Sequence, residues 1–184
     1  MRIKAINLPR VEAVYDAFLC HNKSLTSLTL PEVRSVGTGF ICLNAVLTNL
    51  SMPKLEGTGH GFLTSNEELT SLSLPEVTGV GNGFLTLNAR LTSVSLPKVK
   101  WVGNGFLHCN EVVTSLELPE VKSVGHDFLC RNSALTSLSF PKLETIGDSF
   151  LYCNEELSSL DVPNAKCVGV FFLYNNTNGL STSL

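Results

Sequence analysis

The sequence has little charge of either sign and no long apolar run. Only 16% of its 184 residues are charged, and 13 Lys and Arg stand against 16 Asp and Glu, for a net charge of −3. This balance does not favour binding to nucleic acid, whose phosphates select strongly basic proteins. The longest uncharged apolar stretch, Val168 to Tyr174, is far shorter than the roughly 18 residues that a membrane span needs. The composition therefore predicts a mildly acidic, soluble protein without a membrane span.

The beginning of the sequence also lacks a secretory signal. The segment MRIKAINLPRVEAV holds only a few apolar residues before Pro9, Arg10 and Glu12, whereas a signal peptide carries an apolar region of about 7–15 residues. As written, the chain is predicted to be cytoplasmic. A cell-surface or host-directed location is the alternative if the chain is a fragment of a longer protein.

Proline occurs in this sequence at one fixed spacing and nowhere else. All eight prolines recur every 22 residues, and one Phe column and one Asn column follow the same period. We number the positions of each 22-residue unit as places 1 to 22, counted from its first apolar residue, which is Ile3 in the first unit and Leu25 in the second. Eight units then cover residues 3–178 as a single domain, and residues 179–184 begin a ninth, incomplete unit. The Asn column at place 20 comprises Asn22, Asn44, Asn66, Asn88, Asn110, Asn132, Asn154 and Asn176.

Each unit has the pattern of one short strand followed by a return segment. Leu25, Leu28 and Leu30 alternate with polar residues and stop at Pro31, which is typical of a strand. The Gly at place 13 permits a tight corner, and the Phe at place 16 is the largest core filler. A 22-residue unit cannot bury these faces alone, but stacked units align them into continuous ladders. We therefore predict a right-handed solenoid.

The unit L-x-x-L-x-L-P-x-x-V-x-x-V-G-x-x-F-L-x-x-N-x-x-L resembles the leucine-rich repeat, and most closely its BspA-like class, for example in LTSLSLPEVTGVG at 69–81. The resemblance covers nearly the whole chain. It implies a mostly β leucine-rich repeat solenoid of the α/β horseshoe class, with short turn or 3-10 segments, eight repeats, a microbial origin and a role in adhesion or host contact. Two positions depart from the family, because place 9 carries Val or Leu instead of Asn and the Asn column stands at place 20. We expect this column to satisfy buried backbone groups at a corner as a structural ladder.

Neither end of the repeat array has an evident polar cap. Ile3, Ile6 and Leu8 open the first strand, and the stub GLSTSL begins a ninth strand. Two explanations stay open: the chain is a fragment of a longer repeat protein, or its ends pair with another copy, as exposed strand edges do.

The charged columns single out one interaction candidate. Place 8 alternates in sign from Arg10 to Lys142, which fixes the register of the stack. The pairing of place 8 with place 10 breaks at Lys98, Lys100 and Lys122, beside Trp101, the only Trp and the only large residue in its column. Because Trp and basic residues are enriched at binding hot spots, we expect these four residues to contact a partner. The alternative is that Trp101 simply lies over the glycines of the preceding units.

The cysteines and acidic residues give no site of their own. The six cysteines are expected to be small buried hydrophobes; Cys20 and Cys42 are one unit apart and could bridge, but a reduced compartment is the expectation. His108, Cys109 and Cys130 could approach one another, yet their spacing matches no zinc pattern. Glu117 and Asp161 should stand about 10 Å apart, outside the usual range for a catalytic carboxylate pair. We expect no metal, no cofactor and no catalysis, since G-x-S-x-G and phosphate-loop motifs are also missing.

The leading hypothesis is thus a non-enzymatic leucine-rich repeat scaffold that binds a protein of unknown identity through its strand face and the adjoining charged edge. A structural solenoid that self-associates through its ends is the first alternative. Ice binding is the second, because Thr at place 2 and Ser at place 3 form a regular hydroxyl array like that of β-solenoid antifreeze proteins.

Overall fold

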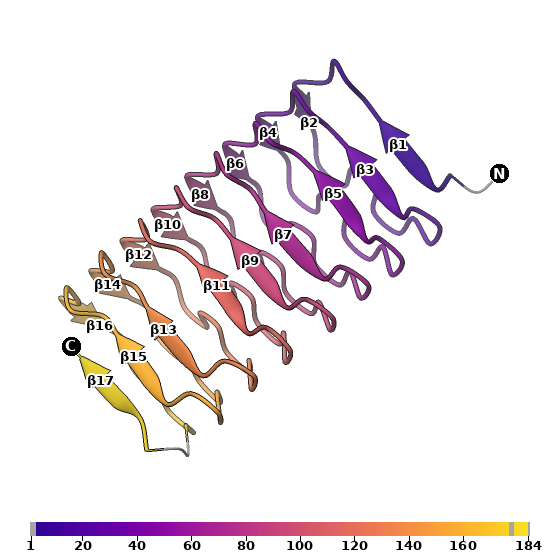
Figure 1. Cartoon of the computed structure of the whole chain (residues 1–184). Helices are drawn as coiled ribbons and strands as arrows, with labels where there is room; N and C mark the ends of the chain where they lie inside the picture. Colours follow the sequence, from indigo (N-terminus) through magenta and orange to yellow (C-terminus); the bar gives the residue numbers. More distant parts are fainter. Residues whose placement is uncertain (1–2, 177–178, 184) are drawn as a thin grey trace.

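The computed structural model describes residues 3–176 and 179–183 and confirms the solenoid. The chain winds as a right-handed coil of about eight turns, with two strands a turn arranged in two rows (Figure 1). The first row, of three-residue strands, comprises β1 (Ala5–Asn7), β3 (Ser27–Thr29), β5 (Asn49–Ser51), β7 (Ser71–Ser73), β9 (Ser93–Ser95), β11 (Ser115–Glu117), β13 (Ser137–Ser139), β15 (Ser159–Asp161) and β17 (Ser181–Ser183). The second row, of two-residue strands, comprises β2 (Ala13–Val14), β4 (Ser35–Val36), β6 (Gly57–Thr58), β8 (Gly79–Val80), β10 (Trp101–Val102), β12 (Ser123–Val124), β14 (Thr145–Ile146) and β16 (Cys167–Val168).

All strand pairing is parallel and joins equivalent places of successive turns. The second row forms one continuous eight-stranded sheet, whereas the first row is divided into three sheets of three strands each. Leu28 of β3, for example, stands beside Ile6 of β1 and Leu50 of β5. The 22-residue period of the sequence is therefore the register of the fold.

The core runs through the coil as ladders of identical residues. The rings of the Phe column stack from Phe18 to Phe172, with centroids of neighbouring rings 5.1–5.8 Å apart. The rings from Phe40 to Phe150 are completely buried. Because each aromatic side chain buries a large apolar area, this ladder is a main source of cohesion between turns.

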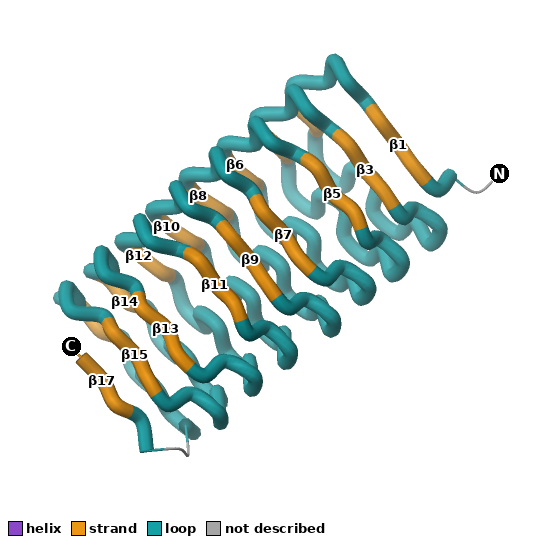
Figure 2. Tube along the Cα trace, in the orientation of Figure 1, coloured by secondary structure: helices purple, strands orange, loops and turns teal. Residues whose placement is uncertain are grey.

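The α/β horseshoe class implied by the resemblance is not confirmed, since the described residues contain no helix and the return side of each turn is strand and turn (Figure 2). The reason is the backbone at places 15, 17 and 19, where every one of the eight turns has positive φ, as at Leu63 (54°) and Ser65 (56°). A right-handed helix needs consecutive residues with negative φ, so this alternation excludes it.

The Gly at place 13 allows the turns to approach closely. A Cβ added to Gly59 would lie 2.5 Å from the carbonyl carbon of Gly37 in the preceding turn, and one added to Gly81 would lie 2.6 Å from the Gly59 oxygen. In the first turn the same place holds Tyr15, whose side chain is 87% exposed. Glycine at this place therefore lets each turn pack closely on the one before it.

Candidate partner-binding site

The charges of place 8 form separate pairs between turns, so that each lysine bonds to one neighbour instead of two. In each pair the lysine donates to the glutamate of the preceding turn: Lys54 to Glu32, Lys98 to Glu76 and Lys142 to Glu120. The Lys98 Nζ lies 2.8 and 2.7 Å from the two carboxylate oxygens of Glu76. Of the predicted basic residues, Lys98 therefore has its charge compensated within the fold.

Lys100 and Lys122 of place 10 differ from Lys98. Elsewhere in this column Arg34 pairs with Glu56 and Lys166 with Glu144, but within residues 3–176 neither of these two lysines forms an ion pair. They stand in successive turns, where the Lys122 amide donates to the Lys100 carbonyl at 2.7 Å. The fold therefore holds two lysines in successive turns that have no ion-pair partner among the described residues.

The surroundings of the two lysines are basic on balance. A cleft of about 520 Å³ is lined by Lys100, Glu120, Lys122, Lys142, Glu144 and Asn164. The hydrogen bond from Lys142 lowers the pKa of Glu120, and the charges of the two unpaired lysines lower it further. Along this edge five lysines (98, 100, 122, 142, 166) meet three glutamates (76, 120, 144), which leaves an excess of two positive charges.

Trp101 both packs on the fold and faces solvent. It lies in β10 between Gly79 of β8 and Ser123 of β12, and its indole ring covers Gly79, where a Cβ would meet ring atoms Cε2, Cζ2 and Nε1. The side chain is nevertheless 53% exposed. Packing over Gly79 and contact with a partner are therefore compatible at this residue.

The ring of Trp101 closes one end of a shallow groove on the second-row sheet. The groove has a volume of about 280 Å³ and is lined by Ser35, Val36, Glu56, Gly57, Thr58, Gly59, Thr78, Gly79 and Trp101. A Cβ added to Gly57 would find a single neighbour, the Gly79 oxygen at 3.7 Å, so the floor there is bare backbone. This groove was not predicted from the sequence, although two successive glycines in a column of small residues were its visible signal.

The Asn column hydrogen-bonds to the backbone across turns. From Asn44 to Asn154 these side chains are completely buried. The Oδ1 of Asn88 accepts from the Asn66 amide at 2.9 Å, and its Nδ2 donates to the Leu63 carbonyl at 3.1 Å. Among the described residues, the one buried side-chain atom without a hydrogen-bond partner is Oδ1 of Asn132. The side chains of the Asn column therefore hydrogen-bond to the backbone at a corner of the coil, and those that are completely buried are not accessible to a ligand.

A second polar ladder, at place 14, was missed by the sequence analysis. There the side chain of one turn accepts the backbone amide of the next, as when Asn82 Oδ1 accepts from the Asn104 amide and His126 Nδ1 from the Asp148 amide. Polar residues that can accept a hydrogen bond fill this column from Asp16 to Asp148, which was the available signal.

The cysteines differ from the expectation in two respects. Cys20 and Cys42 form a disulfide, with Cα atoms 4.7 Å apart, because stacking brings equivalent places of adjacent turns to bonding distance. Of the four free cysteines only Cys130 is buried, and Cys167 is exposed. Burial raises the pKa of the Cys130 thiol to about 12, and its Sγ donates to the Ser149 carbonyl at 2.9 Å. Cys130 is thus an unreactive core thiol at neutral pH.

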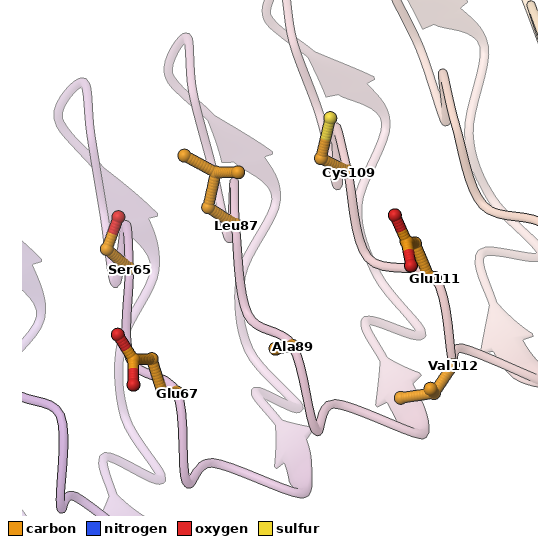
Figure 3. Close-up of a pocket in the computed structure, with 7 residues that line it drawn as sticks. All are labelled: Ser65, Glu67, Leu87, Ala89, Cys109, Glu111 and Val112. Atoms are coloured by element: carbon orange, nitrogen blue, oxygen red, sulfur yellow. The ribbon is translucent and has the colours of Figure 1, made fainter.

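The three residues considered as zinc ligands, His108, Cys109 and Cys130, do not all line the same cleft. His108 and Cys130 line one cleft, together with Asp127 and Arg131, and burial lowers the pKa of His108. Cys109 instead lines a different cleft of about 520 Å³ (Figure 3). In the part of the chain that the structure describes, no three His, Cys, Asp or Glu residues gather to hold a metal ion.

The cleft of Figure 3 lies along one edge of three successive turns and is lined by Ser65, Glu67, Leu87, Ala89, Cys109, Glu111 and Val112. Neither Glu117 nor Asp161, the considered carboxylates, belongs to it. Glu117 accepts from Ser95 at 2.5 Å, and Asp161 accepts from Ser139 at 3.0 Å. Each carboxylate is therefore engaged by a serine of the preceding turn.

Comparison with known proteins identifies the family. The model described as BspA type Leucine rich repeat region (6 copies) matches residues 2–106 and residues 62–178. No curated protein and no solved structure matches the chain. Within the described residues, no helix is long and apolar enough to span a membrane. With its 22-residue period, parallel solenoid and family match over nearly its whole length, the chain belongs to the BspA-type leucine-rich repeat family.

Proposed function

We propose that this chain is a non-enzymatic scaffold that binds another protein through its strand rows and the adjoining charged edge. The observation that supports this proposal is the pair Lys100 and Lys122, which lack ion partners within the described residues, beside the half-exposed Trp101. Uncompensated charge steers and orients a partner, and a Trp anchor supplies affinity. The engagement of Glu117 and Asp161 by serines counts against catalysis.

The disulfide bears on where this binding takes place. Disulfides persist in oxidising locations and are rare in the reducing cytosol. Cys20–Cys42 therefore supports a cell-surface or other extracellular location over the cytoplasmic one expected from the sequence. Such a location also agrees with the adhesion or host contact that the family resemblance implies.

The two alternatives receive less support. For ice binding, the place 2 hydroxyls would have to face outward, yet Thr92 donates to the Thr70 carbonyl at 2.9 Å. For end-to-end assembly, the Cβ of Tyr15 would meet the backbone of any turn stacked on it in the register of the coil, as the glycine column indicates. At the other end, β17 already pairs with β15, where the first strand of a second copy would bind.

The test is capture from an extracellular protein fraction with purified baits under non-reducing conditions. We expect a protein that is retained by the wild type and lost on Trp101→Ala and on the double variant Lys100→Glu, Lys122→Glu. Tyr15→Ala is the matched control, because it removes an exposed aromatic residue far from the site. Equal retention by all baits would contradict the proposal, and a solution mass that rises with concentration would favour self-assembly instead.

A further inference from the structure

The groove beside Trp101 does not offer a partner an open strand edge for pairing. Its floor is Gly57 and Gly79, which pair with each other in the parallel sheet. Because the second row is one continuous sheet from β2 to β16, the strands at the groove are paired on both sides. A ligand therefore cannot add a strand there, and recognition must rest on apolar contact and on charge.

Charge is distributed unevenly along the groove. Glu56, next to Gly57 in the chain, is the one charged residue from the described ranges that lines the groove, and it is paired with Arg34. Lys100, which directly precedes Trp101 in the chain, and Lys122, one turn further on, line the neighbouring cleft, and neither has an ion partner among the described residues. A ligand that lies in the groove and continues past Trp101 therefore passes a paired carboxylate first and then reaches two lysines without ion partners.

Building on the proposed function, we propose that this groove binds an extended acidic segment of a partner protein, with an apolar side chain on Gly57 against Trp101 and carboxylates at Lys100 and Lys122. The open space above Gly57 accepts the apolar side chain, since a Cβ there has no close neighbour. The two ammonium groups select acidic residues, because unpaired charges gain most from opposite charge in a partner.

The spacing of the two contacts defines the segment. Gly57 and Lys122 belong to turns three steps apart, or about 14 Å at about 4.8 Å a step. An extended chain advances about 3.3 Å per residue. The apolar residue therefore lies about three positions from the acidic residue at Lys100 and about four from the one at Lys122, in either chain direction.

A fluorescence titration tests this inference, because Trp101 is the only Trp. The probes are two synthetic peptides without aromatic residues, one in which a leucine precedes a pair of glutamates by about three to four positions and one in which it follows them by the same spacing. We expect saturable change in Trp101 emission with a Kd on the order of 100 µM. No change up to ~1 mM peptide would overturn the inference.

Two variants separate the contacts. Gly57→Val fills the groove and should weaken peptide binding at least about tenfold, whereas Thr145→Val, a surface change in the same column two turns beyond Trp101, should leave it unchanged. The peptide with glutamines should lose binding to the wild type, and a peptide with lysines should bind the variant Lys100→Glu, Lys122→Glu. Unchanged binding by Gly57→Val, or equal binding of the glutamine peptide, would refute the inference.

The capture experiment distinguishes this inference from the broader proposal. Loss of partner capture on Trp101→Ala, with full capture by Gly57→Val, would overturn the groove inference while the scaffold function stands. Full capture by Trp101→Ala would contradict both the groove inference and the proposed scaffold function.

Discussion

The indole ring of Trp101 occupies the space into which a side chain on Gly79 would extend. Gly79→Ala should therefore displace the ring, shift its emission to longer wavelength and lower the free energy of unfolding by no more than about 1 kcal/mol, since an exposed ring can move. Gly57→Ala is the matched control, because the Cβ there has room. Fluorescence spectra and urea unfolding give both quantities. Identical spectra for the two variants would show that the ring does not lie over Gly79 in solution.

The Cys20–Cys42 bond ties the first turn to the second across a 22-residue separation. Cys20→Thr with Cys42→Thr should lower the free energy of unfolding by about 3 kcal/mol, because the cross-link restricts the unfolded chain. Thr is the matched replacement, since Thr64 and Thr86 occupy the same place in later turns and donate to backbone carbonyls. Urea unfolding measures the loss, and reduction of the wild type should reproduce it. If the reductant lowered the free energy of unfolding of the double variant by the same amount, the loss in the wild type would not come from the disulfide.

Asn88 and Asn132 occupy the same buried place but differ in hydrogen bonding. Asn88 uses both its Oδ1 and its Nδ2, whereas Oδ1 of Asn132 has no partner within the described residues. Asn88→Ala should therefore destabilise the fold more than Asn132→Ala, by about 1 kcal/mol, which is the usual contribution of one hydrogen bond. Chemical denaturation of the two variants measures the difference. Equal losses would mean that the Oδ1 contact of Asn88 contributes nothing.

Ser149 and Gly83 share place 15, where φ is positive: 56° at Ser149 and 67° at Gly83. Ser149→Gly should raise the free energy of unfolding by about 1 kcal/mol, because L-residues are strained in this region and Gly is not. Gly83→Ala should lower it by a similar amount through strain alone, since its Cβ would have no neighbour closer than 3.8 Å. Thermal unfolding should show a higher melting temperature for Ser149→Gly and a lower one for Gly83→Ala than for the wild type. Changes of the same sign would contradict the role of strain at this place.

Much of the fold was predictable because each turn buries the same kinds of residue at the same places. The apolar residues of places 1, 4 and 6 could be assigned to a strand from their alternation, and the Asn column to a buried corner from its invariance across units. The absence of helix could not be predicted, because the Leu and Ile of place 17 and the mixed residues of place 19 give no sign of positive φ. The place 14 ladder was overlooked since its members differ in residue type and share only the ability to accept a hydrogen bond.

The sequence by itself determined the period, the register and the composition of the core, because a stacked repeat must align identical residues. Only the tertiary structure decided which charges are compensated and which remain free. Lys98 and Lys100 stand two residues apart in the chain, yet Lys98 reaches the glutamate of the preceding turn, whereas Lys100 follows Thr78 in its column and has no acid there. The same holds for Trp101, whose packing over Gly79 and open flank beside Gly57 arise from contacts between turns that a linear pattern does not contain.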